Sequence, residues 1–365
     1  MSKKIKIDLI AGTRPNFMKV ASLVHAIKNY TGEAELSYRL IHTGQHYDKQ
    51  MSEIFFDELQ IPEPEINFGA GGGTQAEQTA QVMLAYERLL NDQKPDLCVV
   101  VGDVTSTMAC TIAARKMCVK VAHVEAGIRS GDLTMPEEIN RILTDSICNY
   151  FYTTTEEATQ NLVNMGQQKN NIFFVGNTMI DTLLRNENNL KPPTNIDSKI
   201  YEKQEYALVT LHRPSNVDNP ISFNEKIKFL CNINRKINFI FPVHPRTMKS
   251  LSEDTKEIRN LFLTEPLSYF NFIYLLKNCK FVVTDSGGVT EEATMFKTPC
   301  ITMRDTTERP ETVTLGSNIL VGSDLNLLKS TIERLLVEGW KNASIPPRWD
   351  GKSGDRIINS IVNLF

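Results

Sequence analysis

The sequence predicts an α/β protein of two domains, each built on a parallel β-sheet with helices on both faces. The chain has 365 residues, which corresponds to about two domains of ordinary size. Short runs rich in Val and Ile alternate with longer stretches of helical spacing, which is the pattern of covered parallel sheets. Residues 191–205 interrupt this rhythm with two prolines and many charges, and we interpret them as a linker.

The apolar runs are the expected strands. They lie at residues 5–10, 36–41, 96–101, 119–124 and 171–175, and then at 206–211, 237–241, 281–284, 299–303 and 318–321. Segments between them, such as 76–90, have apolar residues at helical spacing. Segment 353–365 has the pattern of an amphipathic helix that could pack back on the first domain. We therefore expect a first domain at 1–190, a linker at 191–205 and a second domain at 206–350.

Composition and charge exclude several classes of protein. Hydrophobic residues make up 41% of the chain and charged residues 23%, as in an ordinary globular protein. The 40 basic and 43 acidic side chains nearly balance, so we expect neither a nucleic-acid nor a membrane partner. No apolar run approaches the roughly 18 residues of a membrane span, and the first apolar stretch is too short for a signal peptide. The seven cysteines form no CxxC motif and are typical of reduced thiols, so we expect a cytoplasmic protein.

Glycine-rich and polar segments follow the expected strands, at the sheet edge where doubly wound proteins bind ligands. Gly12-Thr13-Arg14-Pro15 follows the first strand and opens a helix, with Lys19 one turn further on. The helix start and the guanidinium suit a phosphate or carboxylate, although an ordinary βα turn has the same appearance. Five of the six histidines (42, 46, 123, 212 and 244) also lie at or beside strand ends. Together these features indicate a polar cleft between two domains.

A second segment of this kind lies in the later half of the chain. Asp285-Ser286-Gly287-Gly288 combines two glycines with a hydroxyl at a helix start, which indicates a diphosphate cradle. Glu291 or Glu292 could accept hydrogen bonds from ribose hydroxyls, and helix capping is the alternative for both.

Three carboxylates fall at the edge of the first sheet. Asp103 and Glu125 each come just after an apolar strand, and Glu137 follows Pro136 at a helix start. General acid–base chemistry needs carboxylates held at one site in different environments. For Glu137 a structural role, as an i,i+4 partner of Arg141, is equally consistent with the sequence.

Several other motifs fail. His42 and His46 have zinc-ligand spacing but lie in an expected loop, and GAGGGT at 69–74 does not follow a buried strand. The chain has no P-loop, no GxSxG and no DxD motif. We therefore expect no metal and no nicotinamide cofactor. The charge of a diphosphate would have to be balanced by cationic side chains: Arg14, Lys19, Arg213 and Arg309.

Eight segments together resemble the non-hydrolysing UDP-N-acetylglucosamine 2-epimerase family. They are GTRPNFMK, TGQHYD, GDVTSTMA, HVEAGIRSGD, MPEEINR, TLHRPSN, TDSGGVTEEA and MRDTTERPE, in the order of the family and spread over residues 5–322. The resemblance implies two Rossmann-like domains arranged as in GT-B glycosyltransferases, with the active site in the interdomain cleft. It also implies a homodimer and a role in polysaccharide biosynthesis.

The resemblance assigns roles to residues of this chain. The expected catalytic residues are Asp103, Glu125, Glu137 and His212, the last near the diphosphate. The expected substrate-binding residues are Arg14, Lys19, Phe272, Ser286, Gly287, Gly288, Glu292 and Arg309. Phe272 falls where the family stacks an aromatic ring on uracil.

The chain also departs from the family pattern. Asn16-Phe17-Met18 stands where well-studied members have Glu-Ala-Ile, and Leu267 where they have a glutamine. Some members bind a second UDP-N-acetylglucosamine through an Arg–Gln pair, but this chain has Gly72-Gly73 there. We therefore expect no such activation, although Gln45 and His46 are present.

The family chemistry inverts C2 of the sugar by elimination of UDP and its re-addition through a 2-acetamidoglucal, with no cofactor. Three alternatives remain open on sequence: an epimerase of a related UDP-2-acetamido sugar, a hydrolysing epimerase that releases N-acetylmannosamine, and a GT-B glycosyltransferase. A non-catalytic sugar-nucleotide-binding regulator is disfavoured because all three carboxylates are present.

Overall fold

The structure is a computed structural model that describes residues 3–44 and 56–365. Gln45 and His46 therefore lie outside the described residues. The chain divides into two compact units: unit 1 contains Met1–Asn186 and Pro347–Phe365, and unit 2 contains Glu187–Pro346. We had expected the first domain to end at residue 190 and the second at 350. Across the described residues, no helix is both long enough and apolar enough to cross a membrane.

Unit 1 is built on a seven-stranded parallel sheet with the order β3-β2-β1-β4-β5-β6-β7. Its strands are β1 (Lys4–Ala11), β2 (Glu35–His42), β3 (Ile66–Asn67), β4 (Leu97–Val101), β5 (Lys120–Ala126), β6 (Tyr150–Thr153) and β7 (Ile172–Phe174). All five residues of β4 are buried, as in a central strand covered on both faces.

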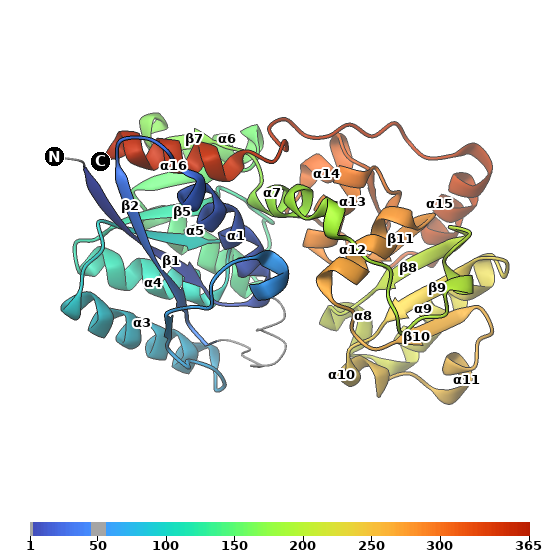
Figure 1. Ribbon diagram of the computed structural model, residues 1–365. Coiled ribbons are helices and arrows are strands. Elements are labelled where there is room, and N and C mark those ends of the chain that lie inside the picture. Colours follow the sequence, from blue (N-terminus) through green and yellow to red (C-terminus); the bar gives the residue numbers. More distant parts are fainter. Residues whose placement is uncertain (1–2, 45–55) are drawn as a thin grey trace. The chain divides into compact units, whose positions relative to one another are not determined.

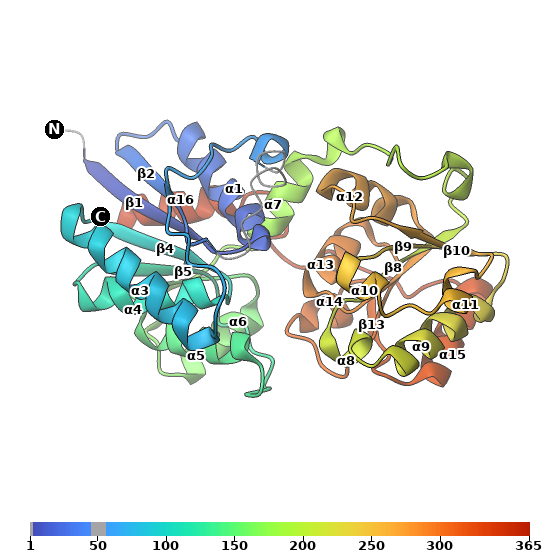
Figure 2. The ribbon, with the colours of Figure 1, turned by 90° about the horizontal axis from the view of Figure 1, so that it is seen from below.

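Helices cover both faces of this sheet (Figure 2). They are α1 (Arg14–Asn29), α3 (Gln75–Asp92), α4 (Thr105–Lys116), α5 (Pro136–Ile147), α6 (Glu156–Asn164), α7 (Thr178–Arg185) and α16 (Ser353–Leu364). α3, α4 and α5 lie along one face, and α1, α7 and α16 along the other. α3 buries only Val82, Tyr86 and Leu90, one stripe of a surface helix, whereas residues 16–27 of α1 are buried throughout. α1 is therefore the central helix of its layer.

Unit 2 repeats the plan with a six-stranded parallel sheet in the order β10-β9-β8-β11-β12-β13. Its strands are β8 (Tyr206–Thr210), β9 (Asn238–Pro242), β10 (Leu261–Thr264), β11 (Phe281–Thr284), β12 (Cys300–Thr302) and β13 (Asn318–Leu320). Its helices are α8 (Pro214–Val217), α9 (Pro220–Ile233), α10 (Pro245–Met248), α11 (Glu253–Lys256), α12 (Tyr269–Asn278), α13 (Gly287–Phe296), α14 (Pro310–Thr314) and α15 (Leu325–Glu338).

The core of unit 2 joins α9 and α15 to one face of the sheet, and α12 and α13 lie on the other (Figure 2). In both units the strand order reverses beside the first strand, between β1 and β4 and between β8 and β11. These reversals are the topological switch points at which doubly wound sheets bind ligands. The expectation of two Rossmann-like domains is confirmed.

The expected strands are all present, but three more occur: β3, β6 and β10. β3 has two residues, and β10 is a short edge strand of which only Leu261 is buried. β6 pairs with β5 and β7, and its sequence YFYT lacks the Val and Ile run of the other strands. Pairing with neighbouring strands places β3, β6 and β10 in the two sheets, whereas their own sequences did not predict them.

The expected linker at 191–205 is not a free segment. It belongs to unit 2 and contains the short helix Ser198–Ile200. Tyr201 is buried, and its hydroxyl donates to the Pro193 carbonyl at 3.2 Å. The prolines and charges that break the strand–helix rhythm therefore lie in a segment packed on its own domain.

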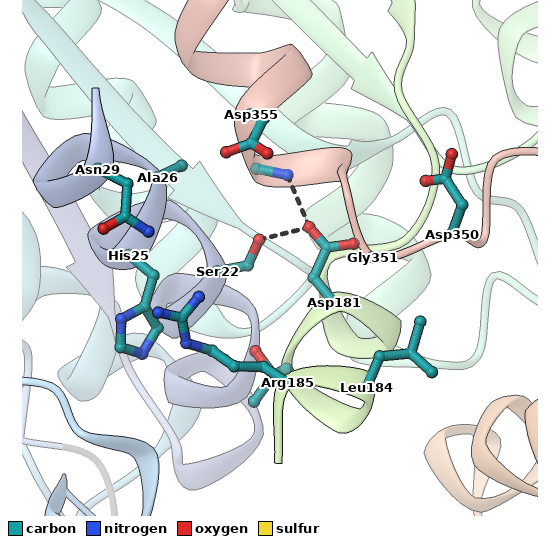
Figure 3. A pocket seen from close by; sticks show the side chains of 12 residues that line it. Ser22, His25, Ala26, Asn29, Asp181, Leu184, Arg185, Asp350, Gly351 and Asp355 are labelled. Carbon is teal, nitrogen blue, oxygen red and sulfur yellow. Dashed lines mark hydrogen bonds between the residues drawn. The ribbon is translucent and has the colours of Figure 1, made fainter. Parts of the chain in front are cut away.

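The C-terminal helix α16 belongs to unit 1 and lies beside α1 (Figure 1). The Asp181 carboxylate accepts from Ser22 Oγ and from the Gly354 N–H, both at 2.7 Å, which joins α7, α1 and α16 (Figure 3). A cavity of about 340 Å³ beside this junction is lined in part by His25 and Arg185. It contains none of the expected site residues.

Candidate active site

The switch point of unit 1 is organised by Asn16, a residue at which the chain departs from the family pattern. Its Oδ1 accepts from the backbone N–H groups of Gly12 and Thr13, both at 3.0 Å, and its Nδ2 donates to the Val101 carbonyl at 3.3 Å. This side chain ties the turn after β1 to the end of β4. Arg14, the first residue of α1, is exposed at this edge.

Lys19 and Glu125 form a buried ion pair, with 7% of each residue exposed. Glu125 has φ +74°, at an irregularity in the pairing of β5 with β6. A non-glycine residue in this conformation costs about 1–3 kcal/mol, and such strain concentrates at functional sites. The fold therefore holds this carboxylate in a strained backbone position.

Gly102 lies against this pair. A Cβ at Gly102 would be 2.8 Å from Lys19 Nζ and 3.3 Å from Glu125 Oε2, and Gly102 has φ +67°. The positive φ favours glycine at this position, and a Cβ would also displace the Lys19 ammonium from its place against the pair. Asp103 is the next residue, so the position of its backbone depends on the close approach of Gly102 to the Lys19–Glu125 pair.

Asp103 is held by Arg141 of α5, whose Nη2 pairs with Asp103 Oδ2. Arg141 also pairs with Glu138 at 2.9 Å, and Glu138 accepts from the N–H groups of Ser130 and Gly131. The Asp103 side chain stays 25% exposed, so it is both anchored and accessible. The pairing of Arg141 with Glu137 was the structural alternative on sequence; in the structure Arg141 pairs with Asp103 and Glu138, and Glu137 is half-buried in the first turn of α5.

The switch point of unit 2 is organised by Asp285, which is fully buried. Its carboxylate accepts from the backbone N–H groups of His212 and Arg213, from Asn216 Nδ2, and from His212 Nδ1 at 2.9 Å. Burial raises the pKa of Asp285, but the hydrogen bonds from His212, Arg213 and Asn216 outweigh it and hold that pKa below its usual range. The His212 side chain remains 57% exposed beside this anchor.

The expected diphosphate cradle lies at the start of α13. Ser286 is the N-cap residue, and Gly287 and Gly288 are half-buried in the first turn. A Cβ at Gly287 would lie 3.0 Å from Glu308 Oε1, so this glycine also permits close packing. The N–H groups of a helix start with little side-chain cover suit an anion.

Glu292, further along α13, is 4% exposed. Burial raises its pKa to about 8, while the hydroxyl of Tyr269, which donates to Glu292 Oε1 at 3.0 Å, lowers it. Phe272 lies one turn from Tyr269 on α12 and is half-buried.

Arg309 is buried and donates from Nε to Glu291 Oε1 at 2.5 Å. Arg309, which we expect to contact the ligand, is therefore paired with Glu291. Glu291 is the alternative to Glu292 as the ribose partner. Glu308 beside it pairs with Arg304 at 2.7 Å and lies 3.7 Å from Arg213.

The expected residues thus form two groups. In unit 1, Lys19 and Glu125 pair against Gly102, Asp103 is the next residue and pairs with Arg141, and Arg14 and Glu137 lie on α1 and α5. In unit 2, the switch-point and α13 residues are His212, Ser286, Gly287, Gly288 and Glu292, with Phe272 on α12 and Arg309 paired to α13. Sequence reasoning gave no supporting role to Asn16, Glu138, Tyr269 or Glu308. Asn16, Glu138 and Glu308 lie inside the matched segments, and that was the signal available for them.

The glycine segment 69–73 leads into α3. Gly72 and Gly73 have φ of +81° and +79°, and Thr74 and Glu77 then form a capping box. Among residues 3–44 and 56–365, no three His, Cys, Asp or Glu side chains are grouped so as to hold a metal ion. The absence of a metal, of a cofactor and of a second UDP-sugar site stays a prediction.

Comparison with known proteins identifies the family. Residues 28–362 match the family model of UDP-N-acetylglucosamine 2-epimerase. The UDP-N-acetylglucosamine 2-epimerase of Methanocaldococcus jannaschii is 41% identical, over 98% of this chain and 99% of its own. The UDP-2,3-diacetamido-2,3-dideoxy-D-glucuronate 2-epimerase of Pseudomonas aeruginosa is 38% identical, over 89% of this chain and 90% of its own.

A solved structure agrees with these relatives. The crystal structure of Methanocaldococcus jannaschii UDP-GlcNAc 2-epimerase in complex with UDP-GlcNAc and UDP superposes with a TM-score of 0.87 at 40% identity, covering 98% of this chain and 100% of that one. The fold, the extent of the match and the identity lead to one conclusion: this chain belongs to the UDP-N-acetylglucosamine 2-epimerase family of isomerases.

Proposed function

We propose that this protein is a non-hydrolysing epimerase that interconverts UDP-N-acetylglucosamine and UDP-N-acetylmannosamine. The observation that carries the proposal is the buried Lys19–Glu125 pair against Gly102, the residue before Asp103, at a topological switch point. Chains named for this activity cover almost the whole protein.

The chemistry must remove a hydrogen from C2 of the sugar, which is not acidic. Elimination avoids a free carbanion. A carboxylate takes the C2 proton, the C1–O bond breaks with its electron pair leaving on UDP, and a C1–C2 double bond forms. Protonation of C2 on the opposite face and return of the UDP oxygen to C1 then give the epimer. Atoms and electrons balance, and there is no net oxidation.

The carboxylates of unit 1 suit the proton transfers. The Lys19 ammonium beside Glu125 stabilises the ionised carboxylate, which is the form that accepts a proton. Asp103 is anchored by Arg141 yet stays accessible, and Glu137 lies at the start of the same helix as Arg141. General acid–base catalysis of this kind contributes about 10²–10⁴-fold in rate.

The residues of unit 2 suit the nucleotide. Ser286, Gly287 and Gly288 would hold the diphosphate at the start of α13, with His212 beside them. Glu292 would accept from the ribose, and Phe272 would stack on uracil. Arg14 would add positive charge that stabilises the leaving UDP. The homodimer and the cytoplasmic location remain predictions, and light scattering measures the first.

The test is incubation with UDP-N-acetylglucosamine in deuterated water, followed by NMR. We expect deuterium at C2 of both epimers and only traces of free UDP. The Glu125→Gln variant removes a carboxylate proposed for proton transfer and should incorporate deuterium at C2 at least tenfold more slowly. Accumulation of free N-acetylmannosamine with UDP would instead show a hydrolysing epimerase. Exchange only with UDP-2,3-diacetamido-2,3-dideoxy-D-glucuronate would assign the substrate of the Pseudomonas relative.

A further inference from the structure

His123 is a fully buried histidine on β5, two residues before Glu125, and has no role in the reaction as proposed above. Its Nε2 lies 2.8 Å from the carbonyl oxygen of Gly102, at the end of β4. Its Nδ1 lies 2.7 Å from Oδ1 of Asp145, a fully buried residue of α5. The ring therefore joins three elements directly behind the carboxylates of unit 1.

Counting donors and acceptors gives the charge of this ring. A carbonyl oxygen only accepts, so Nε2 carries a proton. The other oxygen of Asp145 receives the Gly127 N–H at 3.0 Å and Arg129 Nη2 at 2.7 Å, both of which donate. An acid with these partners is ionised, so Nδ1 of His123 must donate as well. A ring that donates from both nitrogens is an imidazolium cation.

The charge of Arg129 also favours the ionised form of Asp145. Burial raises the pKa of Asp145, but the charges and hydrogen bonds of His123 and Arg129 outweigh it and hold that pKa below its usual range. Cys148, just after α5, also lies beside Asp145, and its thiol pKa is raised by burial, by Asp145 and by Cys98 of β4. The Gly102 carbonyl, just after β4, faces Nε2 of the ring.

We infer that His123 is a positioning residue: as an imidazolium held by Asp145, it fixes the Gly102 carbonyl and so keeps Asp103 and Glu125 in their mutual geometry. The positioning role rests on the proposed function, because that function makes Asp103 and Glu125 important. The charge assigned to the ring does not depend on it.

The link from His123 to both carboxylates is short. Gly102 makes two hydrogen bonds with β5. Its N–H donates to the Val124 carbonyl at 3.0 Å, and its carbonyl accepts from the His123 ring. Without the ring, the Gly102 carbonyl would be buried without that donor, and Gly102, which precedes Asp103, would lose one of its two hydrogen bonds with β5. Errors of about 1 Å in such a site cost as much as 10²-fold in rate.

The alternative is a histidine that only stabilises the fold. His25 of α1 provides a matched control, because it is also buried in unit 1 and its Nε2 lies 2.9 Å from the Leu59 carbonyl. It lies on none of the elements that carry the three carboxylates, so His25→Gln should lower stability without changing the chemistry.

The experiment has two readouts on the full-length protein. First, NMR of protein labelled with ¹⁵N in its histidine rings, at pH 7.5, should show one ring protonated on both nitrogens. The His123→Gln variant assigns the signal by its loss. In Asp145→Asn the ring should lose its second proton. A neutral His123 ring in the wild-type protein would overturn the inference.

Second, kinetics separate positioning from stability. His123→Gln should lower kcat at least tenfold while UDP affinity, measured by calorimetry, changes less than twofold. His25→Gln should keep kcat within twofold, and thermal unfolding shows what each variant loses in stability. Wild-type kcat in folded His123→Gln would reject the positioning role. If His123→Gln does not fold, Asp145→Asn takes the same kinetic test. Absence of any epimerase activity in the wild type would instead reject the proposed function, and the NMR result would stand.

Discussion

Glu292 offers a sharp test of the nucleotide site, because its protonation and its proposed role oppose each other. Burial raises its pKa to about 8, so in the free protein at neutral pH the group is mostly a neutral acid. A ribose hydroxyl donates a stronger hydrogen bond to the ionised carboxylate than to the neutral acid. Binding should therefore favour loss of the Glu292 proton, and UDP affinity should rise with pH until the carboxylate is ionised in the free protein too.

The magnitude follows from the pKa. About one molecule in a hundred has Glu292 ionised at pH 6, and about half at pH 8, so affinity should rise by up to ~50-fold between them if only the ionised form binds. Above pH 9 the curve should be flat. Glu292→Gln should bind UDP more weakly by about 1–3 kcal/mol at pH 9 and lack this part of the pH dependence.

Isothermal titration calorimetry measures both quantities. UDP itself titrates near neutral pH, but it does so equally with both proteins, so the difference between wild type and Glu292→Gln isolates the carboxyl group. Repeating the titration in buffers of different ionisation enthalpy counts the protons released. Tyr269→Phe removes the donor that lowers the pKa of Glu292, so it should move the wild-type curve to higher pH. Parallel curves for wild type and Glu292→Gln would refute the reasoning.

Three further results are expected. Asp103→Asn should lower kcat by ~10²-fold or more with UDP affinity little changed, since the carboxylate is assigned to proton transfer; equal losses in both would make it a ligand contact. Gly102→Ala should lower both kcat and the melting temperature, because its φ is +67° and the new Cβ would be 2.8 Å from Lys19 Nζ; wild-type values for both would contradict the close packing of this turn. The folded-state pKa of Glu292 lies above its unfolded value, so its protonation stabilises the fold at low pH, and that stabilisation is lost as pH rises from about 4.5 to about 8. Glu292→Gln should therefore gain stability relative to wild type between pH 5 and pH 8, by about 1.4 kcal/mol per pH unit at most, and equal changes in thermal unfolding would exclude that shift.

The strand–helix rhythm was readable from the chain because parallel strands buried on both faces need continuous apolar runs. β1, β4, β8 and β11 all lie where such runs predicted them. The placement of Gly102, Asp103, Ser286 and Gly287 just after strands followed from the same rule, since the carboxyl ends of parallel strands share one edge of a sheet.

The partners of the charged side chains were decided by the tertiary structure. The i,i+4 spacing allowed Arg141 to pair with Glu137 on the same helix. In the structure, Arg141 of α5 forms an ion pair with Asp103, which follows β4. Arg309, which we expect to contact the ligand, is buried and donates to Glu291, a pairing that the sequence did not indicate. A long side chain reaches several candidate partners, and only the packing of distant elements selects one.

The strained backbone of Glu125 and the charge of the His123 ring were also decided by the tertiary structure. No local pattern indicates that Glu125 has a positive φ, because that conformation comes from the pairing of β5 with β6. No local pattern indicates that His123 donates from both nitrogens, because its acceptors come from β4 and α5. The order of apolar and polar residues along the chain determined the two sheets and the edge at which the chemistry lies. The contacts between elements far apart in sequence decided which groups are anchored, strained or charged there, because burial and hydrogen-bond geometry exist only after those elements have packed.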